Sequence, residues 1–245
     1  MSIQVIADNS LADHILAMLR EDNKSHDTER GDSVHVSDLV FPRRTWLGAH
    51  HPKPLTDFDL LYFTAGRAHH EIIEKLINKQ EMREVKLDYR GIVGTVDALA
   101  ADGTPVEVKS TRVKTPYVPS NVPDNFVTQL GMYSAMMNPE EQAGSGTILL
   151  FYLGIKEEVN GVWRNIPHLQ SFRIDFTDLP KIRATMLYRK HLLTLDTIPS
   201  TETCSRGLCR VCKWHKAECD GWGSDLDYRV RESLQKQRSI WIASH

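Results

Sequence analysis

Two strand-forming runs joined by a tight turn constrain the fold of this 245-residue chain more than any other feature. Residues 91–99 and 105–110 have the composition of two strands. Asp102-Gly103 between them is a strong hairpin signal, because glycine readily adopts the backbone angles that a tight turn requires. Residues 83–90 alternate apolar and charged side chains, which is typical of a half-buried strand. These segments predict a strand meander in the middle of the chain.

Helical and strand patterns follow one another along the rest of the chain. We expect helices at 10–21, from Ser37 or Asp38 to Trp46, and at 56–79, 123–138 and 178–196; the apolar run 147–153 predicts a strand buried on both faces, and 171–176 predicts an alternating strand. The polar stretch 22–33 is expected to be an exposed loop or linker. This order predicts an α/β fold with a mixed central sheet flanked by helices.

Length and composition limit the class of protein. We divide the chain into an N-terminal helical region (1–55), a core (56–200) and a C-terminal cysteine segment (201–245). No apolar run is long enough to cross a bilayer and the first residues do not resemble a signal peptide, so we expect a cytoplasmic protein with no membrane partner. The net charge of −2 argues against a basic nucleic-acid coat protein. If the protein binds nucleic acid, local basic patches or metal ions would have to neutralise the phosphates.

The hairpin carries two acidic residues and a lysine that can meet at one point. Glu107 and Lys109 are two residues apart on one predicted strand, so both project to the same side, and the turn brings Asp97 of the preceding strand close to them. We expect Val96, Val106 and Val108 to pack beneath. Two carboxylates suit Mg²⁺ or Mn²⁺, and a nearby lysine can orient or deprotonate the water that hydrolyses a phosphodiester. The alternative is a solvated strand face, since Glu-x-Lys alone is common.

Two of the predicted helices carry polar residues at helical spacing. On the helix at 56–79, Gly66, His70 and Glu74 lie on one stripe, where glycine allows close approach of a neighbouring chain and neutral histidine is a good metal ligand. On the helix at 123–138, Gln129 and Tyr133 share a face. Taken alone, His70 fits a surface or satisfied core histidine better than a ligand, and Gln129 and Tyr133 fit an ordinary amphipathic helix.

All four cysteines lie within one short segment near the C-terminus. Cys204, Cys209, Cys212 and Cys219 have the spacing C-x4-C-x2-C-x6-C. Thiols this close together, in a chain expected to be cytoplasmic, favour a metal site over a disulfide framework. Both an iron–sulfur cluster and a tetrahedral zinc ion suit four thiolates on one compact loop. Either group would be structural, because the protein would fill all four ligand positions.

Taken together, these motifs resemble those of RecB-like nucleases of the PD-(D/E)XK class. The resemblance rests on Gly66…His70…Glu74, Gly94-Thr95-Val96-Asp97, Glu107-Val108-Lys109 and Gln129-x-x-x-Tyr133, in the family's order and approximate spacing. It implies a restriction-endonuclease-like core. It also implies that His70, Asp97, Glu107 and the carbonyl of Val108 bind the catalytic metal, that Lys109 is catalytic, and that Gln129 and Tyr133 position DNA. His69 is the alternative to His70.

The cysteine segment extends this resemblance. Cys209-x-x-Cys212 with Cys219 is similar to the C-terminal cysteine trio of CRISPR-associated iron–sulfur exonucleases, which favours a 4Fe-4S cluster over zinc. Members of that group take a fourth cysteine from near the N-terminus, before a Pro-Arg-like segment. Here Phe41-Pro42-Arg43 has no such cysteine, so Cys204 is expected to be the fourth ligand and the link between the two ends of the domain is expected to be lost.

The sequence also offers candidate DNA contacts. Arg43, Arg44, Arg67, Arg112 and Lys114 are placed to meet phosphates, Trp46 and Tyr117 to stack on bases, and the loop at 110–122 to guide the substrate, although each also fits an ordinary structural role. The resemblance implies a single-stranded DNA exonuclease acting with partners in repair, recombination or CRISPR spacer acquisition. The rival predictions are a non-catalytic, zinc-stabilised nucleic-acid-binding module and a restriction-type duplex endonuclease.

Overall fold

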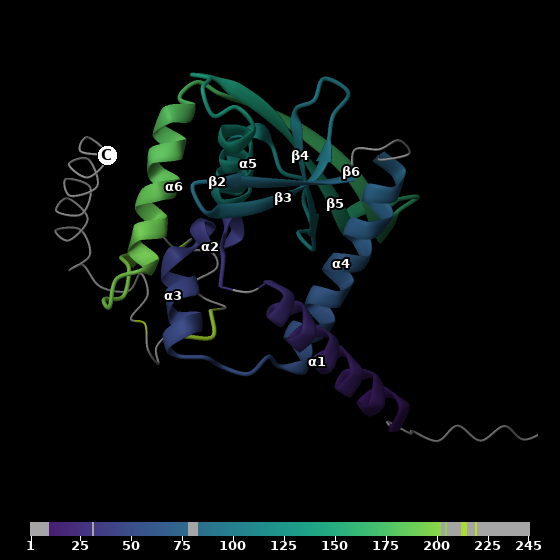
Figure 1. Cartoon of the computed structure of the whole chain (residues 1–245). Coiled ribbons are helices and arrows are strands. Elements are labelled where there is room, and N and C mark those ends of the chain that lie inside the picture. The colour runs from purple at the N-terminus through teal and green to yellow at the C-terminus, as the bar shows by residue number, and fades with distance from the viewer. Residues whose placement is uncertain are drawn as a thin grey trace, which may run out of the picture.

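The protein is a mixed α/β structure in which helices flank a curled mixed sheet (Figure 1). The computed structural model describes residues 10–30, 32–77, 83–201, 204, 212–214 and 219. The strands are β1 (Val34–His35), β2 (Arg83–Tyr89), β3 (Ile92–Leu99), β4 (Pro105–Thr111), β5 (Gly144–Val159) and β6 (Val162–Phe176). The helices are α1 (Ser10–Arg30), α2 (Val36–Val40), α3 (Pro42–His50), α4 (Asp57–Ile77), α5 (Asp124–Met137) and α6 (Leu179–Leu193), with a short 3-10 helix at Pro119–Asn121. Among these helices, none combines the length and the apolar character needed to span a bilayer.

The sheet has the strand order β1-β3-β4-β5-β6, and β2 pairs with β3 as well. The β2–β3, β3–β4 and β5–β6 pairs are antiparallel, whereas β1–β3 and β4–β5 are parallel. The predicted mixed sheet and the meander of β2, β3 and β4 are therefore confirmed. The turn before β4 contains Gly103 at φ 79°, as the Asp-Gly signal predicts.

Helix α5 covers one side of the sheet and contributes to two of the hydrophobic core clusters. Its residues from Leu130 to Met136 are buried without interruption. Met132 and Tyr133 pack with Ile92 and Val96 of β3, and Leu130 packs with buried apolar residues of β5. The helices predicted at 123–138 and 178–196 are confirmed as α5 and α6.

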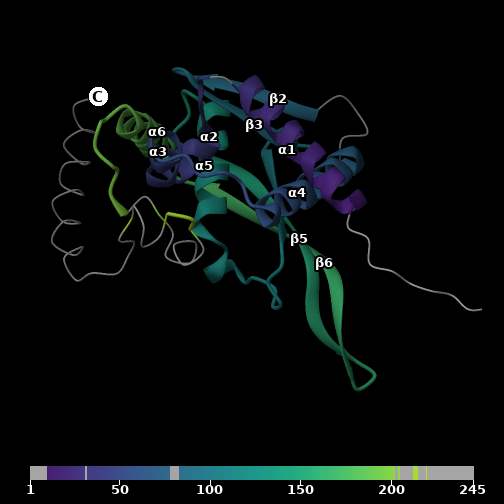
Figure 2. The same cartoon turned by 90° about the horizontal axis from the view of Figure 1, so that it is seen from below.

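Strands β5 and β6 form a hairpin that projects beyond the rest of the molecule (Figure 2). The sequence patterns predict only the parts at 147–153 and 171–176, and the rest of the hairpin was missed. Its turn is Asn160-Gly161, with φ of 53° and 76°, a strong hairpin signal that was available in the sequence. The expected burial of 147–153 on both faces is wrong in part, because Ile148, Leu150 and Tyr152 are fully buried whereas the residues between them are only half-buried.

Helix α1 continues through residues 22–30, where a loop or linker was expected. This part is polar, so apolar periodicity does not reveal it. Ion pairs join α1 to α4, between Arg20 and Asp57 and between Arg67 and Asp22, the latter at 3.1 Å. The pair between Arg67 and Asp22 is a contact between helices that the polar sequence of this segment permits.

The single helix expected to end at Trp46 is two helices, α2 and α3, separated at Phe41. Phe41 has φ −133°, outside the helical region, because the residue before a proline is disfavoured there. Asp38 accepts a hydrogen bond from the backbone N–H of His35 at 2.8 Å, so α2 begins before the expected cap. Val36 and Leu39 of α2 lie in the same core cluster as β3 and α5. The described part of the 1–55 region therefore shares its core with the segment that follows.

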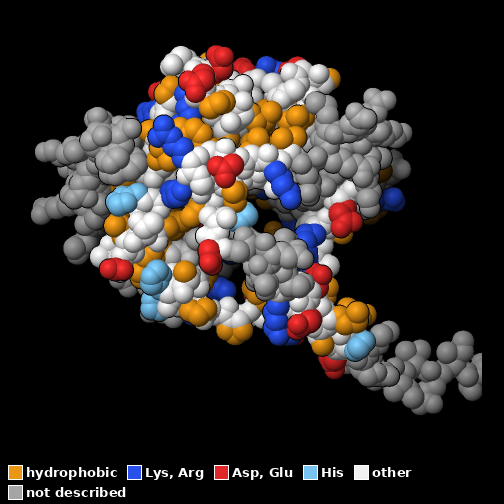
Figure 3. Space-filling view, viewed as in Figure 1, with side chains coloured by type: hydrophobic (Ala, Val, Ile, Leu, Met, Phe, Trp, Pro, Cys, Tyr) orange, Lys and Arg blue, Asp and Glu red, His pale blue; other side chains and the backbone are white. Residues whose placement is uncertain are grey.

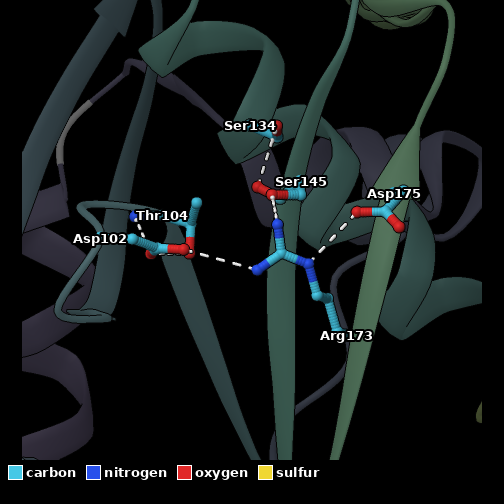
Figure 4. A network of polar contacts seen from close by, with 6 residues as sticks. All are labelled: Asp102, Thr104, Ser134, Ser145, Arg173 and Asp175. Atoms are coloured by element: carbon cyan, nitrogen blue, oxygen red, sulfur yellow. Dashed lines mark hydrogen bonds and ion pairs between the residues drawn. The ribbon is translucent and has the colours of Figure 1, made fainter.

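A polar network at the surface holds the β3–β4 turn against β5 and β6 (Figure 4). Arg173 of β6 forms ion pairs with Asp102 at 3.4 Å and with Asp175 at 3.3 Å, and it donates to the hydroxyl of Ser145 at 2.9 Å. Asp102 accepts from both the N–H and the hydroxyl of Thr104, and these two bonds lower the pKa of Asp102. The network fixes the turn that places Asp97 opposite Glu107.

Candidate active site

The strands β3 and β4 separate at the point where the acidic residues meet. Their pairing comprises Ala98 with Val106 and Leu99 with Pro105. One step further, the carboxylate of Asp97 accepts a hydrogen bond from the backbone N–H of Val108 at 2.7 Å. A side chain therefore replaces a strand-to-strand bond, and it holds the Asp97 carboxylate against β4 beside Glu107 and Lys109.

Glu107 is almost completely enclosed, with 1% of its surface exposed. It forms an ion pair through Oε1 with Lys109 Nζ. Its other oxygen, Oε2, is buried and has no hydrogen-bond partner among the described residues. Burial raises the pKa of Glu107, the Lys109 charge opposes this shift and the Asp97 charge adds to it, so that the pKa rises to about 7 in all. A buried carboxylate oxygen without a donor is costly unless a cation or a proton satisfies it.

Lys109 is held as a cation. Burial alone would lower its pKa, but the neighbouring charges of Glu107 and Asp97 outweigh that effect and raise it. Its ammonium group also lies 5.9 Å from the centre of the Phe126 ring on α5. The sequence left open whether this lysine orients or deprotonates water. The raised pKa favours a role as donor and positive charge at neutral pH.

Tyr133 and Gln129 of α5 lie directly beside this cluster. Gln129 Nε2 donates to the Tyr133 hydroxyl at 3.3 Å, and Tyr133 is buried. Burial raises the pKa of Tyr133, and the nearby Glu107 charge raises it further. The Tyr133 ring occupies the space beside Gly94, where an added Cβ would come within 2.8 Å of the ring. Gly94 therefore allows α5 to bring Tyr133 to the acidic residues.

The apolar support of the cluster differs in one residue from the expectation. Val106 and Val108 are buried together with Ala98. Val96 instead belongs to the cluster formed with α5 and α6. The expected layer of Val96, Val106 and Val108 beneath the site is therefore divided between two clusters.

The long helix predicted at 56–79 is confirmed as α4, which lies beside β3 and β4 (Figure 1). The side chains of His69, His70 and Glu74 lie outside the described residues, so the expected histidine ligand stays a prediction. Gly66 does not serve the close approach that was expected. No described atom lies within 4 Å of the position that its Cβ would take.

Beside Gly66 lies a pocket, which we call the α4–β4 pocket, and it was missed by the sequence reasoning. Its lining residues are Tyr62, Ala65 and Gly66 of α4, residues 110–112 at the end of β4, and Leu153 of β5. Figure 3 shows a hollow in the surface beside α4, with Lys or Arg side chains at its edge. Tyr62 is one of the apolar residues whose spacing predicts the helix at 56–79, so no local signal in the sequence marks it as exposed.

Several candidate DNA contacts are used for packing instead. Trp46 is buried, and its indole N–H donates to the carbonyl of Leu195 at 2.8 Å. Arg43 donates to the carbonyl of Pro199 at 2.6 Å. The N–H of Tyr117 donates to the hydroxyl of Tyr152 at 2.8 Å, which fastens the 110–122 loop to the β5–β6 hairpin. Base stacking by Trp46 is therefore wrong, whereas Arg44 and Arg112 are exposed.

The cysteine segment contacts the N-terminal helices closely. Trp214 is buried against Trp46 and Leu47, and its indole N–H donates to the carbonyl of His51 at 2.8 Å. Arg43 Nε lies 3.1 Å from Cys219 Sγ and donates to it. Side-chain packing therefore joins the described part of the cysteine segment to the N-terminal helices, although the cysteine clamp expected to be lost is indeed missing from the sequence.

Two metal sites were expected, one at the acidic residues of the hairpin and one at the four cysteines, and both stay predictions. Within the described residues, no three His, Cys, Asp or Glu side chains gather into a group that could hold a metal ion. One expected member of each set, the His70 side chain and Cys209, lies outside the described residues. Cys212 and Cys219 contact the same hydrophobic cluster, and Cys204 is half-buried. At the hairpin, the unpartnered Glu107 oxygen beside Asp97 suits a hard divalent cation.

The chain is similar in structure to a known protein. The crystal structure of SSO0001 matches it with a TM-score of 0.52 and 17% sequence identity, over 83% of this chain and 94% of that one. At this identity the match concerns the fold alone. No protein-family model matches the sequence, and the search of curated proteins found no match.

Proposed function

We propose that the protein is a Mg²⁺- or Mn²⁺-dependent DNA nuclease with a restriction-endonuclease-like core of the RecB kind. The observation that carries this proposal is the buried Glu107 carboxylate. One of its oxygens pairs with Lys109, the other has no hydrogen-bond partner among the described residues, and Asp97 is fixed beside it. A purely structural site would not bury the Glu107 carboxylate beside a second acidic residue with only one amine to balance them, because burying an unbalanced charge is costly.

Asp97 and Glu107 would hold the cation, together with the Val108 carbonyl and His70 by the family resemblance. When bound, Mg²⁺ or Mn²⁺ supplies charge neutralisation at the phosphate and activates water for attack. Lys109 is a cation and can stabilise the negative charge that develops on the phosphate oxygens. The backbone N–H of Val108 fixes the Asp97 carboxylate, so the acidic residues are positioned before substrate binds.

The proposal also covers the role of the four cysteines and the biological pathway. Cys204, Cys209, Cys212 and Cys219 would hold a structural 4Fe-4S cluster, with zinc as the alternative. The hydrogen bond from Arg43 to Cys219 Sγ suits a thiolate, which is the form that ligates a metal. The resemblance further suggests a single-stranded DNA exonuclease in repair, recombination or CRISPR adaptation. Iron and zinc analysis of the purified protein separates the two cofactors.

The proposed activity is tested with end-labelled single- and double-stranded DNA in Mn²⁺, in Mg²⁺ and in EDTA. We expect cleavage only with the metals, and a loss of about 100-fold or more in Asp97→Asn and in Lys109→Met. Asp102→Asn is the matched control, because Asp102 lies on the same hairpin but is exposed at the surface. Equal cleavage by Asp97→Asn, Lys109→Met and the wild type contradicts the proposal.

A further inference from the structure

The α4–β4 pocket lies on the two elements that form the proposed active site, but beyond its acidic residues. Arg112 follows Lys109 by three residues, about 10 Å along an extended chain. Gly66 precedes His70 by one helical turn, about 6 Å along α4. The pocket is therefore displaced from the acidic residues along both elements. The displacement is that expected for the nucleotide next to the phosphate that reacts.

The glycine in this pocket has no structural explanation in the surrounding packing. Glycine inside a helix costs about 1 kcal/mol relative to alanine. At Gly94 the close Tyr133 ring explains the absence of a Cβ, but at Gly66 no described atom lies within 4 Å of the Cβ position. Open space beside a glycine, at a position where a side chain would favour the helix, suits a ligand that lies over this surface.

The rim of the pocket combines an aromatic ring with a cation. The guanidinium carbon of Arg112 lies 5.3 Å from the centre of the Tyr62 ring, and Tyr62 is 45% exposed. No ion pair joins Arg112 to an acidic residue in the described part of the chain. Phe58, one turn before Tyr62, stacks near it with ring centres 5.9 Å apart and is 68% exposed. Exposed rings with an adjacent guanidinium are the elements that bind unpaired bases and their phosphates.

From this arrangement we infer that the α4–β4 pocket binds an unpaired nucleotide of the substrate strand, next to the phosphate at the active site. The base stacks on Tyr62 above Gly66, Arg112 contacts the flanking phosphate, and Phe58 offers a surface to the following base. The inference rests on the proposed nuclease function. It assigns to α4 and Arg112 the selection of single-stranded substrate, since the bases of a duplex stack on one another and do not offer a face to the exposed Tyr62 ring.

An apolar segment of a protein partner is the other occupant that exposed aromatic residues can attract. Two observations favour nucleic acid. The cation lies directly on the aromatic ring at the rim, and the pocket is continuous with the strand that carries Glu107 and Lys109. A protein-docking face needs neither of these features.

The test measures binding rather than cleavage, using the full-length protein in EDTA. Fluorescence anisotropy compares labelled oligo-dT with a duplex of equal length. The variants are Tyr62→Leu, which removes the ring, and Gly66→Met, which fills the pocket. Trp163→Leu is the matched control, because Trp163 is 68% exposed and lies on β6, on the projecting hairpin. Thermal unfolding of each variant checks that the fold is retained.

We expect the wild type to bind oligo-dT more tightly than duplex, and both pocket variants to bind it about 5- to 100-fold more weakly. Trp163→Leu should stay within about twofold of the wild type. Arg112→Gln should reduce the salt dependence of binding by about one phosphate contact. Wild-type affinity in both folded pocket variants overturns the inference and leaves this face to a protein partner. The two proposals can fail separately. If the wild type binds DNA but does not cut it, and the pocket variants lose this binding, the pocket is supported and the nuclease proposal is contradicted.

Discussion

Helices α4 and α5 lie against the same strand, β4, yet their apolar residues have opposite environments. On α5 every residue from Leu130 to Met136 is buried. On α4 Leu60 is buried, whereas Phe58, Leu61 and Tyr62 are exposed. Apolar periodicity therefore identifies a face that favours burial, but it does not identify what covers that face. The covered helix supports the acidic cluster, and the uncovered one borders the pocket beside it.

The largest expected difference between the two helices is in stability. Leu130→Ala should lower the free energy of unfolding by about 2–5 kcal/mol, because Leu130 is fully buried and its loss leaves a cavity. Leu61→Ala, the same change at a residue that is 52% exposed, should alter it by less than about 0.5 kcal/mol. Chemical denaturation measures both. Similar losses would show that the α4 face is covered in solution.

The glycines of the two regions give the next largest contrast. Gly94→Ala should destabilise the protein by about 1–3 kcal/mol, because the new Cβ would lie 2.8 Å from Tyr133 and from Val36. Gly66→Ala should instead stabilise it by about 0.5–1 kcal/mol, because alanine favours the helix and meets no described atom. Thermal unfolding distinguishes the signs. Destabilisation by Gly66→Ala would contradict the open pocket.

The pH dependence of stability should distinguish the buried carboxyl group of Glu107, beside α5, from the exposed acidic residues. The pKa of Glu107 is raised from 4.5 to about 7, so the folded protein binds more protons than the unfolded chain between these values. Without metal, stability should therefore fall as the pH rises through this window. Mn²⁺ requires the ionised carboxylate, so the increase in melting temperature that it causes should be larger at pH 8 than at pH 6. Glu107→Gln should abolish this difference, and an equal effect of Mn²⁺ at both pH values in the wild type would count against the site.

The smallest effect is expected at the surface network of the β3–β4 turn. Arg173→Ala removes two exposed ion pairs and a hydrogen bond to Ser145, so it should cost less than about 1 kcal/mol. Activity should fall by less than about tenfold, since the bond from Val108 N–H still holds Asp97. A loss as large as that of Lys109→Met would mean that the turn, and not the buried cluster, limits the geometry of the site.

The sequence predicted the elements whose signals are local and strong. Asp102-Gly103 and the spacing of Glu107 and Lys109 were sufficient to predict that these side chains meet Asp97. The polar end of α1 was not predictable from apolar periodicity, because residues 22–30 contain no apolar side chain and Asp22 pairs with Arg67 of α4. The β5–β6 hairpin was missed although Asn160-Gly161 signals its turn. The exposure of Tyr62 was not predictable, because it depends on which elements lie opposite α4 in the folded chain.

Calorimetric titration of Mn²⁺ into the metal-free protein at pH 8 tests the central claim most directly. The wild type and the Asp102→Asn control should bind Mn²⁺ alike, and Glu107→Gln should bind it about tenfold more weakly or not at all, because the variant loses a carboxylate ligand while its shape is preserved. Equal Mn²⁺ affinity in the wild type and Glu107→Gln would contradict a cation site at the β3–β4 hairpin.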